Sequence, residues 1–266
     1  MVRRRLSRSN LVAPRALALG LGWALFLGGC ASAPPARQPI SPEALAARAL
    51  LERRWDEFSD LRSRAEIKIR RDGRVQRFAD CVLLLRAPSS LRIEVLSPFG
   101  IPVLVVAGDA KALTVWEVLD ERAYILPASP DANRRWLGVA LGGDELVALL
   151  SGRVRPPKDP LALELLPADR VGPSLTLRST DGVQRVWFDP ASGQARAVEW
   201  TGGANPAHVV FADGAPDSPP ADVTLTTPDG KLEVVVKYRD PKMNTGFDAG
   251  LMDLTVPEHV RIQDFR

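Results

Sequence analysis

The sequence predicts a mainly β (α+β) protein, in which a single curved antiparallel sheet of about eleven strands forms an incomplete barrel and helices serve as a lid or plug. Two observations carry this prediction. Apolar and polar side chains alternate with a period of two from Leu61 onward, as in half-buried strands. Turn signals such as Asp72-Gly73 also recur at short intervals, as expected between antiparallel neighbours.

The N-terminal 29 residues have the layout of a targeting segment. Residues 1–15 contain five arginines and no acidic residue, and the 14 residues from Ala16 to Gly29 carry no charge. A membrane-spanning helix needs about 20 apolar residues, so this run fits the core of a signal peptide better. We therefore expect residues 1–29 to be removed as a signal peptide.

The end of that segment carries the most specific motif of the chain. Leu27, Gly28, Gly29 and Cys30 resemble the lipobox that lipoprotein signal peptidase recognises. The resemblance implies cleavage before Cys30 and a thioether-linked diacylglycerol on its sulfur, which would anchor the protein to a membrane. The alternative is an ordinary signal peptide, or an uncleaved anchor, in which Cys30 is incidental.

The residues after Cys30 predict a spacer and a location. Residues 30–42 are rich in proline and small side chains, so we expect a flexible tether there and a folded domain over residues 43–266. The enterobacterial sorting rule that accompanies the lipobox resemblance uses an aspartate after the cysteine for inner-membrane retention, whereas Ala31 follows here. The expected location is the outer membrane of a Gram-negative bacterium, facing the periplasm.

Charge argues against a nucleic-acid partner. Loss of the five N-terminal arginines leaves 30 lysines and arginines against 32 aspartates and glutamates. Binding to phosphates is driven by a basic surface, which this balance does not provide. We therefore expect no nucleic-acid partner.

Three helices are expected around the strands. Ser41-Pro42 is an N-cap followed by a first-turn proline, and an amphipathic helix should run from there to about Phe58. Strands then alternate with turns up to residues 231–238. Two short helices interrupt them, over residues 129–137 and 143–150. The three helices form either a lid over the barrel or a plug that is part of its core.

Few side chains suit catalysis or metal binding. His208 and His259 are the only histidines, and neither has a cysteine or carboxylate at metal-ligand spacing. The sequence has no nucleophile elbow, P-loop or dinucleotide-binding motif. Cys81 lies in an apolar stretch, so a buried free thiol is expected. We predict a protein that is not an enzyme and uses no cofactor or metal.

A turn between two apolar strands carries the strongest functional signal after Cys30. Proline and glycine at Pro98 and Gly100 force a turn and place Phe99 at its tip. Turns are usually polar, so a large apolar residue there is unexpected. Phe99 either folds back over the sheet as core or protrudes to contact lipid or apolar cargo.

At these residues the chain resembles the LolB family, outer-membrane lipoproteins that receive other lipoproteins from the periplasmic carrier LolA. That family has an asparagine-proline-leucine-glycine turn between two strands, and residues 97–109, SPFGIPVLVVAGD, have this form, with Phe99 at the place of the family's protruding leucine. Residues 145–157, ELVALLSGRVRPP, are similar to a second family feature, a helix followed by a proline-containing loop. Phenylalanine in place of leucine leaves open an uncharacterised relative that kept only the fold.

The resemblance implies an unclosed barrel with a helical lid over an apolar cavity for acyl chains. The expected protein is then a monomeric lipoprotein that accepts or inserts lipoproteins or lipids at the outer membrane, with acyl chains as cargo and a LolA-like periplasmic carrier as partner. The alternative is a non-transporting scaffold or assembly lipoprotein that docks a protein partner. We expect Pro98, Phe99 and Gly100 to contact membrane or cargo.

The cavity should be lined by inward-facing apolar residues of four strands. The opposite strand register would move some of them to the other face. The predicted lining residues are Ile67, Ile69, Leu83, Leu85, Ile93, Val95, Val103 and Val105.

Overall fold

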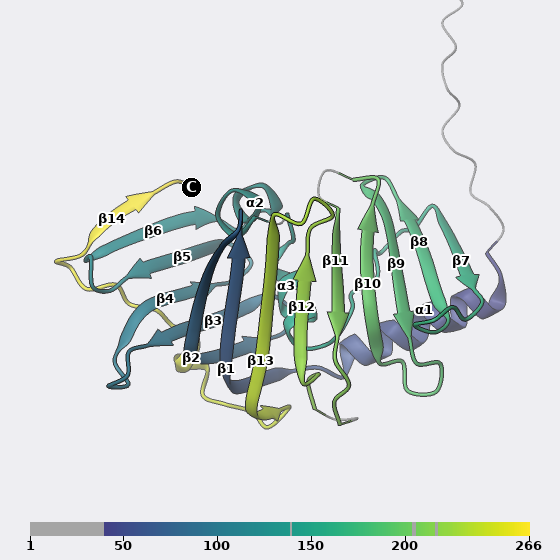
Figure 1. Cartoon of the computed structure of the whole chain (residues 1–266), viewed down its shortest axis with the longest axis horizontal. Coiled ribbons are helices and arrows are strands. Elements are labelled where there is room, and N and C mark those ends of the chain that lie inside the picture. Colours follow the sequence, from purple (N-terminus) through teal and green to yellow (C-terminus); the bar gives the residue numbers. More distant parts are fainter. Residues whose placement is uncertain (1–39, 139, 204–205, 216–217) are drawn as a thin grey trace, which may run out of the picture. The chain divides into compact units, whose positions relative to one another are not determined.

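The computed structural model describes residues 40–138, 140–203, 206–215 and 218–266 (Figure 1). These residues belong to one compact unit, Arg37–Arg266. The predicted signal peptide, Cys30 and most of the predicted tether lie outside the described residues.

Three α-helices lie where the sequence predicts them. The helices are α1 (Pro42–Asp56), α2 (Pro130–Leu137), α3 (Gly143–Leu150) and the 3-10 helix η1 (Ala249–Met252). The Ser41 hydroxyl accepts a hydrogen bond from the Ala44 backbone N–H at 3.1 Å, and Ser129 caps α2 in the same way. The N-cap predicted at Ser41 is thus confirmed, and Ser129 serves the same purpose for α2.

The described residues form a single open sheet of 14 strands, which confirms the fold class and exceeds the expected number. Short strands of five residues, and a strand after the last one expected, account for part of the difference. The strands are β1 (Asp60–Arg71), β2 (Arg74–Arg86), β3 (Ser90–Leu96), β4 (Pro102–Gly108), β5 (Ala112–Glu117), β6 (Arg122–Pro127), β7 (Ala162–Leu166), β8 (Ser174–Ser179), β9 (Gly182–Phe188), β10 (Ala195–Thr201), β11 (Ala207–Phe211), β12 (Asp222–Thr226), β13 (Leu232–Met243) and β14 (Arg261–Asp264).

Two antiparallel meanders make up most of the sheet. Strands β1 to β6 form the first meander and β7 to β13 the second, and the long strands β1 and β13 pair to join them (Figure 1). The last strand, β14, returns to pair with β6 in parallel, an exception to the expected antiparallel pairing. The free edges of the sheet are therefore β7 and β14.

The hairpin signals of the sequence form the turns of the sheet. At the β1–β2 turn, Asp72 and Gly73 have φ of 49° and 78°. A two-residue hairpin needs positive φ at both central positions, which aspartate tolerates and glycine favours. The turn fixes the β1–β2 register and so decides which side chains face inward.

The helices α1 and α3 pack against one side of the sheet, which we call the inner face. In the first meander, Val147 of α3 is buried with Leu61, Leu83 and Leu85 in one apolar cluster. In the second meander, Leu51 of α1 is buried in a cluster with side chains of β8 to β12. α3 therefore acts as a plug that is part of the core, one of the two roles expected for the short helices.

Tyr238 of β13 joins the sheet to the end of α3. Its hydroxyl donates a hydrogen bond of 2.6 Å to the backbone carbonyl of Leu150. Burial raises the pKa of Tyr238 well above its usual range, so the hydroxyl stays protonated and available as a donor.

Candidate functional site

Most of the predicted lining residues share the inner face of the first meander. Residues directly opposite in an antiparallel pair face the same side. Leu83 pairs with Ile93, and Ile67 pairs with Phe78 of β2 and Val236 of β13. Seven of the eight predicted residues belong to, or pack against, the apolar clusters there, and six of the seven occupy regular inner positions. These six are Ile67, Ile69, Leu83, Leu85, Ile93 and Val95.

The two predicted residues of β4 do not join this face in the expected way. Val95 pairs with Leu104, so Leu104 and Val106 take the inner positions of β4. Val105 pairs with Glu94 and faces the opposite, outer side. Val103 lies at a register shift between β3 and β4, where simple alternation fails, and it is half-buried against an apolar cluster.

Val105 is nonetheless only 2% exposed. The C-terminal segment that follows β13 runs over the outer side of the first meander. Arg86 donates a side-chain hydrogen bond of 2.7 Å to the carbonyl of Phe247, and Arg92 donates one to the carbonyl of Asp253. The apolar run of β4, buried on both faces, gives no period-two signal from which its register could be inferred.

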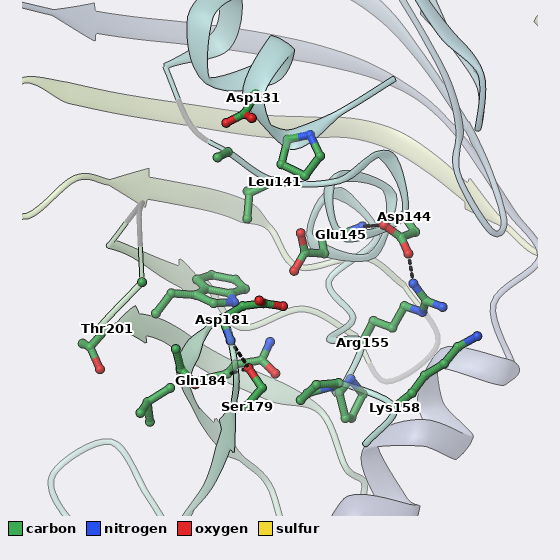
Figure 2. A pocket seen from close by; sticks show the side chains of 18 residues that line it. Asp131, Leu141, Asp144, Glu145, Arg155, Lys158, Ser179, Asp181, Gln184 and Thr201 are labelled. Atoms are coloured by element: carbon green, nitrogen blue, oxygen red, sulfur yellow. Dashed lines mark hydrogen bonds and ion pairs between the residues drawn. The ribbon is translucent and has the colours of Figure 1, made fainter. Parts of the chain in front are cut away.

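A pocket of about 670 Å³ lies elsewhere, on the side of the second meander (Figure 2). Its walls come from residues 130–131 and 140–145 around α2 and α3, from the loop 155–158, and from residues 179–184 and 200–203 of β8 to β10 and their turns. We call it the polar pocket, because acidic, basic and amide side chains line it together with apolar ones. None of the eight predicted lining residues is among its walls.

Glu145 supports one wall of the polar pocket and also caps α3. Its Oε2 accepts a hydrogen bond of 2.8 Å from the Gly142 backbone N–H. Burial raises the pKa of Glu145, and the Asp181 carboxylate raises it further, whereas the bond from Gly142 lowers it. The neighbouring Asp144 forms an ion pair with Arg155 (Figure 2).

Gln184 lies on the opposite wall, on the inner face of β9. It pairs with Leu177 of β8 and Trp200 of β10. Gln184 is only 7% exposed, and its Oε1 is buried without a hydrogen-bond partner in the described part of the chain. Gln184 was not predicted as a site residue, because a single glutamine between polar and apolar strand residues carries no motif.

The predicted contact loop protrudes from the first meander. The Gly100 N–H donates to the Ser97 carbonyl at 2.9 Å, and Gly100 has a φ of 77°, which closes the β3–β4 turn. Phe99 at its tip is 88% exposed. Of the two roles considered for Phe99, protrusion and folding back as core, the structure shows protrusion.

Two further exposed apolar side chains lie near Phe99, and neither was predicted as a contact residue. Ile101 and Leu119 are 61% and 78% exposed. Leu119 lies in the β5–β6 turn, which is adjacent to the β3–β4 loop because the Val118 N–H donates to the Val103 carbonyl at 3.1 Å. We call Phe99, Ile101 and Leu119 the apolar rim; both turns lie at the left in Figure 1. Both could have been recognised in the sequence, because each is a large apolar residue in or next to a hairpin turn.

The remaining candidate residues lie apart from both features. Cys81 is fully buried, and burial raises the pKa of its thiol to about 11. His208 lies on β11 and His259 in the turn before β14. Within the described ranges, no group of three or more His, Cys, Asp and Glu side chains could hold a metal ion. None of the described helices is long and apolar enough to cross a membrane.

Solved structures share this fold. The chain is similar to a domain from Vibrio parahaemolyticus described as that of an outer membrane lipoprotein-sorting protein, with a TM-score of 0.53 and 13% identity over 79% of this chain and 95% of that one. It is also similar to a DUF1329 family protein from Desulfovibrio piger (0.52, 12%, 79% and 97%) and to a LolA superfamily protein from Nitrosomonas europaea (0.52, 12%, 78% and 97%). No family model and no curated protein matches the sequence. At these identities the similarity shows the fold alone.

Proposed function

We propose that this protein is an outer-membrane lipoprotein, tethered through Cys30 and facing the periplasm, that binds acyl chains and passes lipoproteins or lipids to the membrane. The fold supports the proposal, because one similar structure is described as an outer membrane lipoprotein-sorting protein domain and another as a LolA superfamily protein. The lipobox resemblance at residues 27–30 supports the anchor.

The apolar rim is the observation that carries this function. Phe99, Leu119 and Ile101 are the three most exposed large apolar side chains of the described residues. They come from two neighbouring turns, and we propose that they act as one contact surface. Transferring one such side chain from water to an apolar phase is worth about 1.5–3 kcal/mol. Together with a lipid anchor, the rim would hold the first meander against a bilayer.

The inner face of the first meander is the proposed acyl site. Its apolar side chains lie beneath α3, an eight-residue helix whose last carbonyl, that of Leu150, accepts a hydrogen bond from Tyr238. Displacement of α3 would expose this surface to an acyl chain. Burial of a chain of about 16 carbons is worth at most about 13 kcal/mol, at about 0.8 kcal/mol per methylene. Such binding requires no charge or metal.

In this proposal the protein acts as a LolB-like receiver. A LolA-like periplasmic carrier would deliver the cargo, and the apolar rim would release it into the bilayer. The proposed protein is monomeric and performs no covalent catalysis.

A non-transporting scaffold is the second candidate, and the closed packing of the first meander favours it. Val147 of α3 is fully buried against Leu61, Leu83 and Leu85, so the predicted lining surface is occupied by the chain itself. A scaffold would retain this packing and would take up no acyl chain.

The rim can be tested by binding to vesicles of phosphatidylethanolamine and phosphatidylglycerol. The chains carry Cys30→Ser so that the lipid anchor does not dominate. Phe99→Ser should weaken co-sedimentation by about tenfold, the equivalent of about 1.4 kcal/mol of lost burial. Val171→Ser is the matched control, because Val171 is an exposed apolar residue in a loop of the second meander. Equal binding of Phe99→Ser and the unsubstituted chain would refute a role of the rim in membrane contact.

A further inference from the structure

Basic side chains gather on the outer side of the sheet where the two meanders join. Successive residues of a strand face opposite sides, so four bases of β1 share the outer side: Arg62, Arg64, Lys68 and Arg70. Residues directly opposite in an antiparallel pair also face the same side. Four more bases lie opposite outer residues of β1: Lys237, Arg239 and Lys242 of β13, and Arg77 of β2. We call these eight side chains the basic face.

The carboxylates of the same side are shared between several bases. Glu66 forms ion pairs with both Arg77 and Arg239, at 3.3 and 3.2 Å. Glu233 likewise forms ion pairs with two bases of β1, at 3.6 and 2.7 Å. Asp80 pairs with a single base of β1. Three carboxylates therefore serve five of the eight bases.

The other three bases have no carboxylate within ion-pair distance in the part of the chain that the structure describes. They are Arg62, Lys237 and Lys242, and all three are exposed. Two more acids lie nearby, Asp222 opposite Lys237 and Asp240 at the register shift of β13. Even with both counted, eight bases face five acids, so the basic face keeps an excess of positive charge.

The unpaired bases repel each other across the ladder. Arg62 and Lys242 lie directly opposite each other, and the next opposed outer pair, Arg64 and Arg239, is basic on both strands as well. Like charges at such positions destabilise an antiparallel pair. This repulsion acts on the β1–β13 pairing, which joins the two meanders.

The charge of the whole chain does not account for this arrangement. Without residues 1–29 the chain would carry 30 lysines and arginines against 32 aspartates and glutamates. The basic face is therefore a local concentration on an otherwise acidic protein. An anionic partner would supply the missing counter-charges and replace repulsion with attraction.

The dimensions of the basic face indicate a macromolecular partner. Arg62 and Arg70 are eight residues apart on one strand, which corresponds to about 27 Å. None of the eight bases lines the polar pocket, and their side chains lie on the face of the sheet. A small anion would contact only a few of them.

We infer that the basic face docks an acidic surface of a protein partner, whose carboxylates lie against Arg62, Lys237 and Lys242. A bilayer is a uniform negative plane, which the carboxylates of the face would oppose, whereas a protein can place its acids opposite the unpaired bases. The turns of the apolar rim also lie at the left in Figure 1, away from β1 and β13 in the middle. The inference goes beyond the proposed function, because it requires neither acyl binding nor the rim.

The test measures fluorescence anisotropy of three labelled 12-residue peptides, in which serine alternates with glutamate, glutamine or lysine. The protein is the chain from residue 30 with Cys30→Ser. At about 50 mM salt the glutamate peptide should bind at least about tenfold more tightly than the glutamine peptide, and about 200 mM salt should weaken it by about tenfold. The lysine peptide should not bind. Equal binding of the three peptides, or binding that is independent of salt, would overturn the inference.

A double variant locates the contact. Arg62→Gln with Lys242→Gln removes the opposed bases without breaking an ion pair of the described residues. It should weaken the glutamate peptide by about tenfold and should not lower the midpoint of urea denaturation, because repulsion is relieved. A lower midpoint would assign the two bases a structural role instead.

The matched control removes the same charge elsewhere. Arg135→Gln with Arg178→Gln changes exposed bases of α2 and β8 and should leave binding of the glutamate peptide unchanged. Equal losses in the two double variants would contradict a local site.

Vesicles of phosphatidylethanolamine and phosphatidylglycerol distinguish a bilayer from a protein as the partner. Phe99→Ser should leave binding of the glutamate peptide unchanged, because Phe99 is not part of the basic face. If Arg62→Gln with Lys242→Gln weakens vesicle binding more than peptide binding, the face contacts a bilayer and the inference is overturned. Failure of acyl uptake or of rim-dependent vesicle binding would leave the peptide result unchanged, so the two proposals fail separately.

Discussion

The inner faces of the two meanders are covered by different kinds of side chain. In the first, apolar side chains of neighbouring strands pack against Val147 of α3 in a buried core. In the second, α1 covers part of the face, and polar groups such as Glu145 and Gln184 surround an open pocket. The same antiparallel scaffold thus supplies a closed apolar surface on one side and a partly polar, open pocket on the other.

The difference follows from what covers each half. α3 contributes an apolar side to the first meander and the capped, acidic N-terminus with Asp144 and Glu145 to the second. One short helix is therefore placed between the proposed acyl surface and the polar pocket. Movement of α3 would change both.

Thiol reactivity should separate the two halves most strongly. In chains with Cys30→Ser, Cys81 is fully buried with a pKa of about 11, so its labelling by a thiol reagent at pH 7.5 requires opening of the core. Ala140→Cys in the polar pocket should label at least about a thousandfold faster, because a half-buried wall residue needs no opening. Similar rates at Cys81 and at position 140, measured by stopped-flow, would contradict a closed first meander.

Truncation of a side chain should lower the free energy of unfolding more in the first meander than in the second. Leu83→Ala removes a fully buried side chain and should lower the free energy of unfolding by about 3 kcal/mol. Val183→Ala, at the half-buried wall of the polar pocket, should cost less than about 1 kcal/mol. Urea denaturation measures both. Comparable losses would show that the two halves are packed alike.

Removal of the hydrogen bond between the sheet and α3 should lower the free energy of unfolding by a smaller amount. Tyr238→Phe keeps the ring and removes only the donor to the Leu150 carbonyl. We expect a loss of about 1 kcal/mol in the free energy of unfolding, together with faster amide exchange in residues 143–150. If exchange in α3 is unchanged, then Tyr238 does not restrain the helix.

The smallest expected effect is the pH dependence at Glu145. Burial raises the pKa of Glu145 in the folded protein, so its neutral form is favoured there; the stability it contributes is full below the ordinary pKa and is lost as pH rises through the raised one. Relative to the unsubstituted chain, Glu145→Gln should therefore become slightly more stable between pH 4 and pH 8. Denaturation at both pH values measures this difference, and a relative loss of stability at pH 8 would contradict a raised pKa.

Local patterns of the sequence predict most of the elements but only part of the site. Some features depend on only a few consecutive residues, so they can be predicted from the sequence. Examples are the period-two alternation in β1, turn residues such as Asp72-Gly73, and the helix caps at Ser41 and Ser129. The parallel return of β14 to β6 is a long-range pairing with no local signal.

The site residues depend even more on long-range contacts, which local sequence patterns do not predict. Phe99 was recognisable as an apolar residue in a turn, whereas Leu119 joins it only because β4 pairs with β5. Val105 was assigned to the inner face because β4 is apolar on both faces, so no alternation fixes its register. Glu145 and Gln184 line the same pocket only because α3 lies against the second meander. The spacing of the two residues in the sequence does not predict this.

Native mass spectrometry of the purified mature protein tests the central claim, that the inner face of this sheet holds acyl chains, most directly. We predict adducts with the masses of acyl-containing molecules, their loss on delipidation, and their return when a 16-carbon fatty acid is added. Bare protein before and after that addition would contradict acyl binding and support the scaffold.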